Sequence, residues 1–176
     1  MMWRTHALFG ISTLWLLAPL PPEILQANMG VLAAIAALGA LMPDLDASES
    51  KIKHLQIPNT QIKPFMIPAL VVSKTDQHRG LLHSLSGLGM MALFVLPAIF
   101  YTGWAIAVTF LLGYLSHLAA DAATKSSIRL LYLKPRRFHL LPLRWRFTTG
   151  SLAEEVLLAP LAISVISLLL IHFRSF

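Results

Sequence analysis

The chain has 176 residues, of which 56% are hydrophobic and only 12% are charged, and its formal net charge is +6. This composition excludes an ordinary soluble globular domain, so we expect lipid to surround most of the chain. The absence of cysteine excludes disulfides and thiolate metal sites, which leaves histidine and carboxylate side chains to hold any metal.

Five apolar segments predict helices that cross a membrane. The hydrocarbon core of a bilayer is about 30 Å thick and requires roughly 20 mostly apolar residues per helix. A short segment comes first and four longer ones follow, at 6–20, 24–42, 80–101, 103–123 and 152–172. The short segment also resembles a signal peptide, but APLPPE (18–23) offers no A-x-A cleavage pattern, so we expect a helix there.

The connections between these segments predict the topology. Two are tight turns, whereas 43–79 and 124–151 are long and polar and should share one side of the membrane. Of the 14 Lys and Arg residues, 13 lie near the N-terminus or in these two loops. The positive-inside rule makes that side cytoplasmic and the C-terminus periplasmic.

We therefore expect an all-α fold, namely a polytopic helical bundle in the bacterial inner (plasma) membrane. It has about five membrane helices, two long cytoplasmic loops and a single domain over 1–176. In so hydrophobic a chain, basic residues indicate topology and contact with anionic headgroups. Membrane lipids are the expected partners, and no nucleic acid is expected.

Histidine and aspartate collect at the cytoplasmic ends of the predicted helices. His6 precedes the first helix, PDLD (43–46) ends the second, HRGLLHS (78–84) starts the third and HLAAD (117–121) ends the fourth. All four ends should lie in one layer near one membrane surface. Ionisable groups within membrane segments are usually functional, so this layer predicts a metal site.

Each piece also has an ordinary structural explanation. His6 can anchor a helix at the interface, PDLD can be a solvated turn, and His78 can be a first-turn residue after an N-cap at Thr75-Asp76. His117 and Asp121, at i and i+4, share a helical face, which suits either two ligands of one metal or a hydrogen bond between them.

The spacing of His78 and His83 leaves a further question open. They are five residues apart, about 140° around a regular helix, so both can face one metal only if His78 lies in an irregular first turn. A mixture of His and Asp ligands suits zinc, manganese or iron, often in pairs that activate water.

Three other features have structural interpretations. Ser151-x-x-Glu154 predicts a capping box at the start of the last helix. His54 and His139 lie in the basic loops and are expected at the surface.

Several short motifs together resemble one known family. THALFG (5–10), PDLD (43–46), HRGLLHS (78–84), GYLSHLAADAAT (113–124) and TGSLAEE (149–155) are similar to the YdjM-type family of bacterial inner-membrane proteins, described as metal-dependent hydrolases. The resemblance covers nearly the whole chain. The layout is more distantly similar to the zinc-dependent phospholipase C and single-strand nuclease superfamily, whose members cleave phosphoesters with a zinc cluster.

The resemblance implies a set of site residues. The ligand candidates are His6, Asp44, His78, His83, His117 and Asp121. Asp46 is implied as a further ligand or as a base behind the ligands, and Glu154 is a lesser candidate. The chain departs from the family where KSSIRLLYL follows Thr124 in place of a glycine-containing turn, which bears on the shape of the substrate entrance.

These patterns predict a metal-dependent hydrolase with one or two divalent ions, zinc above all. It would cleave a lipid-derived, anionic phosphoester at the cytoplasmic face. Asp46 would take a proton from the attacking water and Arg79 would hold an anionic group of the substrate. The alternative is a non-catalytic membrane protein whose metal is structural or which binds a partner. The sequence leaves the substrate, the metal and the oligomeric state open.

Overall fold

The computed structural model describes residues 1–21, 28–46, 54, 56, 60–66, 80–134 and 136–173. The α-helices of this part are α1 (Trp3–Ser12), α3 (Met29–Leu41), α5 (Leu85–Val95), α6 (Ile99–Thr102), α7 (Trp104–Ala122) and α8 (Leu152–Phe173). Short 3-10 helices are η1 (Thr13–Leu16), η2 (Met42–Asp46), η4 (Leu96–Ala98) and η5 (Leu143–Trp145). The predicted all-α fold is confirmed.

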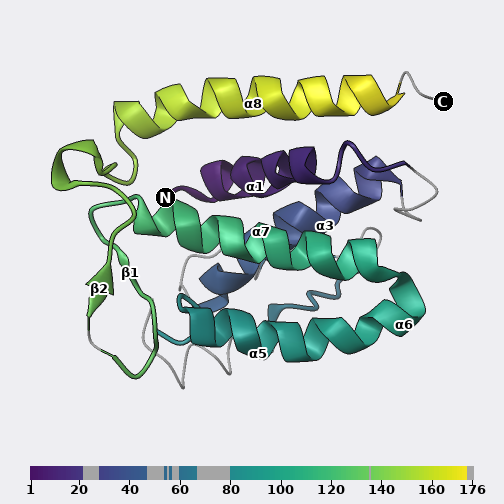
Figure 1. The fold of residues 1–176 in the computed structure, drawn as a ribbon, viewed down its shortest axis with the longest axis horizontal. Coiled ribbons are helices and arrows are strands. Elements are labelled where there is room, and N and C mark those ends of the chain that lie inside the picture. Colours follow the sequence, from purple (N-terminus) through teal and green to yellow (C-terminus); the bar gives the residue numbers. More distant parts are fainter. Residues whose placement is uncertain are drawn as a thin grey trace.

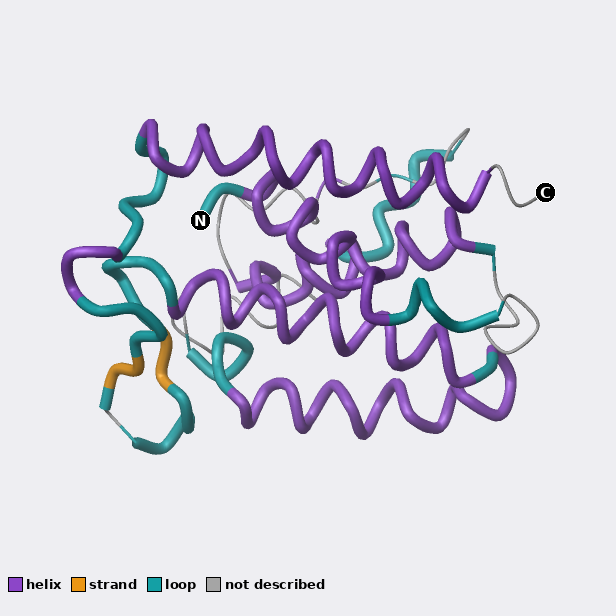
Figure 2. Tube along the Cα trace, turned by 45° about the horizontal axis from the view of Figure 1, so that its top comes forward, coloured by secondary structure: helices purple, strands orange, loops and turns teal. Residues whose placement is uncertain are grey.

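The long helices lie side by side and alternate in direction. In Figure 1, α1, α5 and α8 run away from the end of the bundle that holds the N-terminus, and α3 and α7 run back towards it. The same end carries the connection from α7 to α8, with its two-stranded antiparallel ladder of β1 (Ile128–Arg129) and β2 (Arg137–Phe138). We call this the loop end of the bundle; Figure 2 shows it from a second direction.

Four helical stretches of the described chain are long and apolar enough to cross a membrane: Met29–Asp46, Leu85–Thr102, Trp104–Ala122 and Leu152–Ile171. They correspond to the four longer predicted segments. The first predicted segment, 6–20, folds as α1 and η1, which together have 14 residues and rise roughly 23 Å. This first helical stretch is therefore shorter than the bilayer core.

The third predicted helix begins later than expected, because Ser84 caps it. The Ser84 side chain accepts a hydrogen bond from Gly87 N at 3.2 Å and donates one to Leu81 O at 2.6 Å. Serine is a favoured N-cap residue for this reason. Residues 80–84 consequently form a turn, and His83 lies in that turn rather than on the helix.

Close packing of α3 against α7 forms the centre of the bundle. A Cβ atom added to Gly39 would collide with the backbone of Phe110, and one added to Gly113 would collide with the backbone of Ala36. Small residues let membrane helices approach in this way. The helix backbones are thus in contact along a seam that leads to the loop end.

The prediction of a capping box at the start of α8 is wrong, because the Ser151 and Glu154 side chains do not make its hydrogen bonds. The Glu154 carboxylate accepts hydrogen bonds from Met2 N at 2.5 Å and from Gly150 N at 2.8 Å. Ser151 Oγ is buried without a hydrogen-bond partner among the described residues. Glu154 therefore joins the start of α8 to the start of α1, because the N-terminal segment is close enough to compete for its carboxylate.

Candidate metal centre

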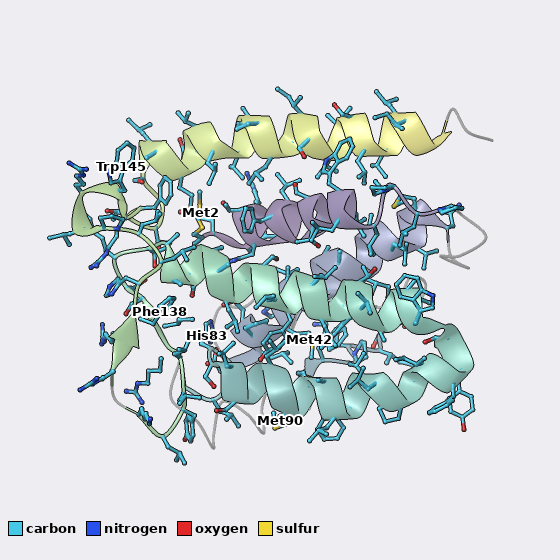
Figure 3. The ribbon with its side chains drawn as sticks, in the orientation of Figure 1. Met2, Met42, His83, Met90, Phe138 and Trp145 are labelled. Carbon is cyan, nitrogen blue, oxygen red and sulfur yellow. The ribbon has the colours of Figure 1, made fainter. Side chains whose placement is uncertain are left out.

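Four chain segments meet at the loop end and bring the predicted His and Asp side chains together. His6 comes from α1, Asp44 and Asp46 from η2, His83 from the turn before α5, and His117 and Asp121 from the end of α7. Figure 3 labels His83 at this end, where α5 begins. All but Asp44 are at most 5% exposed, so the cluster is buried.

A backbone contact fixes the orientation of His117. Its Nδ1 lies 2.7 Å from the carbonyl oxygen of Ala40, and since a carbonyl only accepts, Nδ1 must donate. In a neutral imidazole the lone pair is then on Nε2. Gly113, one turn before His117, touches Ala36, one turn before Ala40, so the close helix contact sets up this hydrogen bond. Metal-binding histidines are typically oriented by such a donor contact.

Two carboxylates of η2 hold His83 from opposite sides of its ring. Asp46 Oδ2 lies 3.4 Å from Nδ1 and Asp44 Oδ1 lies 3.5 Å from Nε2. The short 3-10 turn after Pro43 allows two aspartates that are two residues apart to contact the same ring. The Tyr114 hydroxyl donates to Leu82 O at 2.6 Å and anchors the turn that carries His83.

Two imidazole nitrogens lie close to each other, and each lies within 4 Å of an oxygen of Asp44 and of Asp121. His83 Nε2 lies 3.2 Å from His117 Nε2, 3.5 Å from Asp44 Oδ1 and 3.8 Å from Asp121 Oδ2. His117 Nε2 lies 3.8 Å from Asp44 Oδ1 and 3.9 Å from Asp121 Oδ2. Ligand atoms bonded to a tetrahedral zinc at about 2.0–2.1 Å are roughly 3.3–3.4 Å apart. The donor set therefore fits a small divalent cation with little adjustment.

Asp121 and His6 extend the cluster on its other side. Asp121 Oδ1 lies 3.4 Å from His6 Nε2 and accepts a hydrogen bond from the Met1 amino group at 2.8 Å. The His6 ring stacks on that of His117, with centroids 3.8 Å apart. Its Nδ1 is buried with no hydrogen-bond partner in the described part of the chain. Donor atoms of His6, Asp44 and His117 also lie within 4.8 Å of one another, which gives a second, overlapping group that can hold a metal.

The electrostatics of the cluster favour a cation. Burial lowers the pKa of His83, but its contacts with the carboxylates of Asp44 and Asp46 raise it and prevail, so the pKa rises to about 9. Carboxylates taken out of water are costly unless paired with positive charge or a metal. A divalent cation would neutralise them more fully than a protonated imidazole.

One side chain gives the cluster its access to the surroundings. The Asp44 side chain is 22% exposed, whereas those of His83, His117 and Asp121 are at most 2% exposed. Water or a substrate group would therefore reach the described cluster beside Asp44.

The structure brings together six of the predicted site residues, namely His6, Asp44, Asp46, His83, His117 and Asp121. His78 and Arg79 lie outside the described residues. Glu154 belongs to neither potential metal group and holds backbone N–H groups instead.

Two supporting contacts were not predicted from the sequence. The Ala40 contact uses a backbone carbonyl, which every residue has, so the sequence does not reveal it. Tyr114, three residues before His117, could have been noticed as a buried polar group in a helix rich in small and apolar residues.

These features define a class: a helical membrane protein whose helix ends enclose a buried His/Asp cluster that can hold a metal ion. A family model described as YdjM inner membrane protein matches residues 1–175, and the chain belongs to this family. The earlier resemblance is thereby confirmed, together with the placement among inner membrane proteins.

Two relatives illustrate the range of this similarity. The uncharacterized protein YvsG of Bacillus subtilis (strain 168) is 34% identical over 134 residues, which is 76% of this chain and 75% of the relative. The inner membrane protein YdjM of Escherichia coli (strain K12) is 32% identical over 164 residues, 85% of this chain and 70% of the relative. No solved structure matches the chain.

Proposed function

We propose that this protein is a metal-dependent hydrolase that cleaves a lipid-derived phosphoester at the cytoplasmic face of the membrane. The observation that carries the proposal is the close approach of two imidazole Nε2 atoms to each other and to two carboxylates at the ends of membrane helices. Nitrogen and oxygen donors of this kind favour zinc. When bound, zinc would polarise a phosphoryl oxygen and lower the pKa of a nearby water molecule.

The chain's own residues divide the remaining work. Asp46, which the sequence predicts as proton acceptor, is buried against His83 Nδ1, a contact that supports an orienting role for it. Asp44 is the partly exposed carboxylate of the cluster, at 22%, so it is better placed to take a proton from the attacking water and pass it to solvent. Asp121 belongs to the group formed with His83 and His117, and its other oxygen lies 3.4 Å from His6 Nε2, so it would help to hold a metal and to orient His6.

The preference for an anionic substrate is supported by the charge around the site. The connection from α7 to α8 lies at the loop end (Figure 1) and carries Lys125, Arg129, Lys134, Arg136, Arg137, Arg144 and Arg146. Lipid headgroups can reach this layer without leaving the bilayer. The role of Arg79 in holding the substrate stays a prediction from the sequence.

A structural metal is the second candidate, and a specific observation favours it. Four protein donors around one point are typical of closed, structural zinc sites, whereas catalytic sites usually have three protein ligands and one open position. The two candidates differ in Asp44. In a catalytic site, the Asp44 oxygen would leave one coordination position of the metal free for water. In a structural site, the Asp44 oxygen would bind the metal.

The test is turnover by purified, zinc-loaded protein in vesicles, measured on phospholipids, isoprenoid phosphates and neutral esters. We expect hydrolysis of phosphoesters that a chelator abolishes and that His83→Ala removes. His54→Ala changes an exposed histidine outside the cluster and should leave the hydrolysis of phosphoesters unchanged. Turnover of neutral esters alone would contradict the proposal, and stoichiometric zinc without any turnover would support the structural alternative.

A further inference from the structure

The connection from α7 to α8 presents a basic surface at the loop end of the bundle. Residues 124–151 contain seven Lys and Arg residues and neither Asp nor Glu. Six of the seven are exposed and form what we call the basic surface, namely Lys125, Arg129, Lys134, Arg136, Arg137 and Arg144. None of the six forms an ion pair with another residue that the structure describes. The described part of the protein therefore leaves this charge uncompensated, which suits an anionic partner.

Backbone hydrogen bonds hold the connection at the level where the helices end. At the start of α5, Leu85 N donates to Leu130 O at 3.0 Å. At the end of α7, Leu140 N donates to Ala122 O at 2.8 Å. In Figure 1 the two strands of the connection run across the loop end rather than along the helix axes. The basic surface is therefore tied to two helix ends and does not extend freely into water.

The end of α7 marks the border between hydrocarbon and headgroups. This helix has 19 residues and rises about 28 Å, close to the roughly 30 Å of the hydrocarbon core. It is long and apolar enough to cross the core once. The headgroup layer adds about 5–8 Å on each side, so residues tied to the end of α7 lie in that layer. The exposed side chains of the connection consequently meet headgroups.

Large apolar side chains alternate with the cations of the basic surface. Leu133 is 89% exposed, Leu143 is 71% exposed and Trp145 is 61% exposed. The Arg144 guanidinium lies 5.9 Å from the centroid of the Trp145 ring, and tryptophan is enriched at the border between membrane and water. A nucleic acid would use the cations but leave the leucines in water, whereas a lipid leaflet accommodates both kinds of side chain. The composition of the surface therefore favours lipid.

We propose that the basic surface binds anionic lipids of the leaflet nearest the loop end. Lipid phosphates would contact the six cations, and Leu133, Leu143 and Trp145 would lie among the upper parts of the acyl chains. The inference goes beyond the proposed function, because it requires neither zinc nor hydrolysis. The bound lipids would surround the loop end without entering the His/Asp cluster.

The test compares the lipids next to a fluorescent label on this surface. The chain has no cysteine, so Leu143→Cys provides a single labelling position in the full-length protein. The labelled protein is placed in phosphatidylcholine vesicles with a chelator. A nitroxide near the top of one acyl chain is then supplied on phosphatidylglycerol or on phosphatidylcholine. We expect phosphatidylglycerol to quench at least about fivefold better, the preference that one basic residue near an anionic leaflet provides.

A label at the other end of the bundle is the matched control. Leu16 is exposed and lies in η1, at the end of the first helical stretch that points away from the loop end. Leu16→Cys should be quenched equally by the two nitroxide lipids. Equal quenching of the Leu143 label as well, or quenching of that label mainly by acrylamide from the water, would overturn the inference.

Two triple variants test whether charge causes the preference. Lys134→Gln, Arg136→Gln and Arg144→Gln together should remove most of it, whereas Lys134→Arg, Arg136→Lys and Arg144→Lys preserve the charge and should keep it. Salt should weaken the preference in the wild type, because the Debye length shortens from about 10 Å at 0.1 M to about 3 Å at 1 M. The same preference in both triple variants, or a preference that salt does not change, would contradict the proposal.

The remaining outcomes separate this inference from another partner and from the proposed function. Displacement of phosphatidylglycerol from the Leu143 label by a single-stranded oligonucleotide would make nucleic acid the partner and overturn the inference. His83→Ala changes the cluster and should keep the lipid preference. Absence of hydrolysis with a preserved preference would defeat the proposed function alone, whereas hydrolysis without a preference would defeat this inference alone.

Discussion

His117 illustrates how one residue combines information that the sequence shows with information that it hides. Its spacing from Asp121 predicts a shared helical face, and both residues do contribute to the cluster. The orientation of the ring, however, depends on the Ala40 carbonyl 77 residues earlier in the chain. A backbone oxygen leaves no trace in residue identities, so the donor types were predictable and the fixed tautomer was not.

Replacing His117 by alanine should therefore remove a metal ligand without a large change elsewhere. Loss of a contact that orients a ligand typically costs about 10–100-fold in metal affinity, and loss of the ligand itself should cost at least as much. The measurement is zinc content per protein after dialysis against a metal buffer. His54→Ala, which alters an exposed histidine, should keep the wild-type content, and equal zinc in both variants would refute the site.

Asp46→Asn tests whether Asp46 orients His83 or accepts a proton. An orienting carboxylate makes the imidazole a better donor to the metal, so the amide should weaken zinc binding about 10–100-fold. The measurement is the dissociation constant for zinc, alongside turnover at saturating zinc. Glu155→Gln makes the same chemical change at an exposed position in α8. If zinc affinity is unchanged but turnover is lost, Asp46 would instead be the residue that accepts the proton from water.

At the scale of elements, the seam between α3 and α7 positions the site. Gly113→Ala would push a Cβ into the Ala36 backbone, and such overpacking typically costs about 1–3 kcal/mol. We expect a lower melting temperature and weaker zinc binding, since the His117–Ala40 contact lies one turn further along. Gly89→Ala is the matched control, because it meets no atom. Equal melting temperatures for the two alanine variants would contradict this account of the seam.

Glu154 belongs to the packing of helices rather than to the metal. Glu154→Ala would remove the buried carboxylate that accepts from the N–H groups of Met2 and Gly150, and hydrogen bonds to a charged group contribute about 1.5–3 kcal/mol. Thermal unfolding should shift downwards while folded protein keeps its zinc. Loss of zinc at full stability would instead make Glu154 a ligand.

The elements themselves were largely predictable because lipid imposes length and apolarity on each helix. The segment 103–123 matches α7 within a residue or so, since glycine precedes it and nothing inside it competes with the helix. The start of α5 was less predictable. HRGLLHS has no proline and contains residues that tolerate a helix, and only the local capping by Ser84 ends the turn there.

For the whole molecule, Figure 1 shows that η2 ends, α5 begins and α7 continues into its connection to α8 at the same end of the bundle. The charge distribution predicts that this end is cytoplasmic. Reporter fusions after Arg146 and after Phe176 should therefore report opposite sides of the membrane, with the first in the cytoplasm. A common side for both fusions would mean that α8 does not cross the membrane, and a periplasmic Arg146 would contradict the orientation that the charges predict.

The wide spacing of the cluster in the chain also has a consequence for biosynthesis. His6 leaves the ribosome first, yet its partner Asp121 follows 115 residues later. During translation, α1 and α3 therefore enter the membrane before α7 supplies the partners of their polar side chains. A metal that bound only the completed bundle would stabilise it by mass action, so metal capture would follow the insertion of α7. Chains made under metal starvation would keep unneutralised carboxylates between their helices. We expect such chains to be degraded faster by membrane proteases.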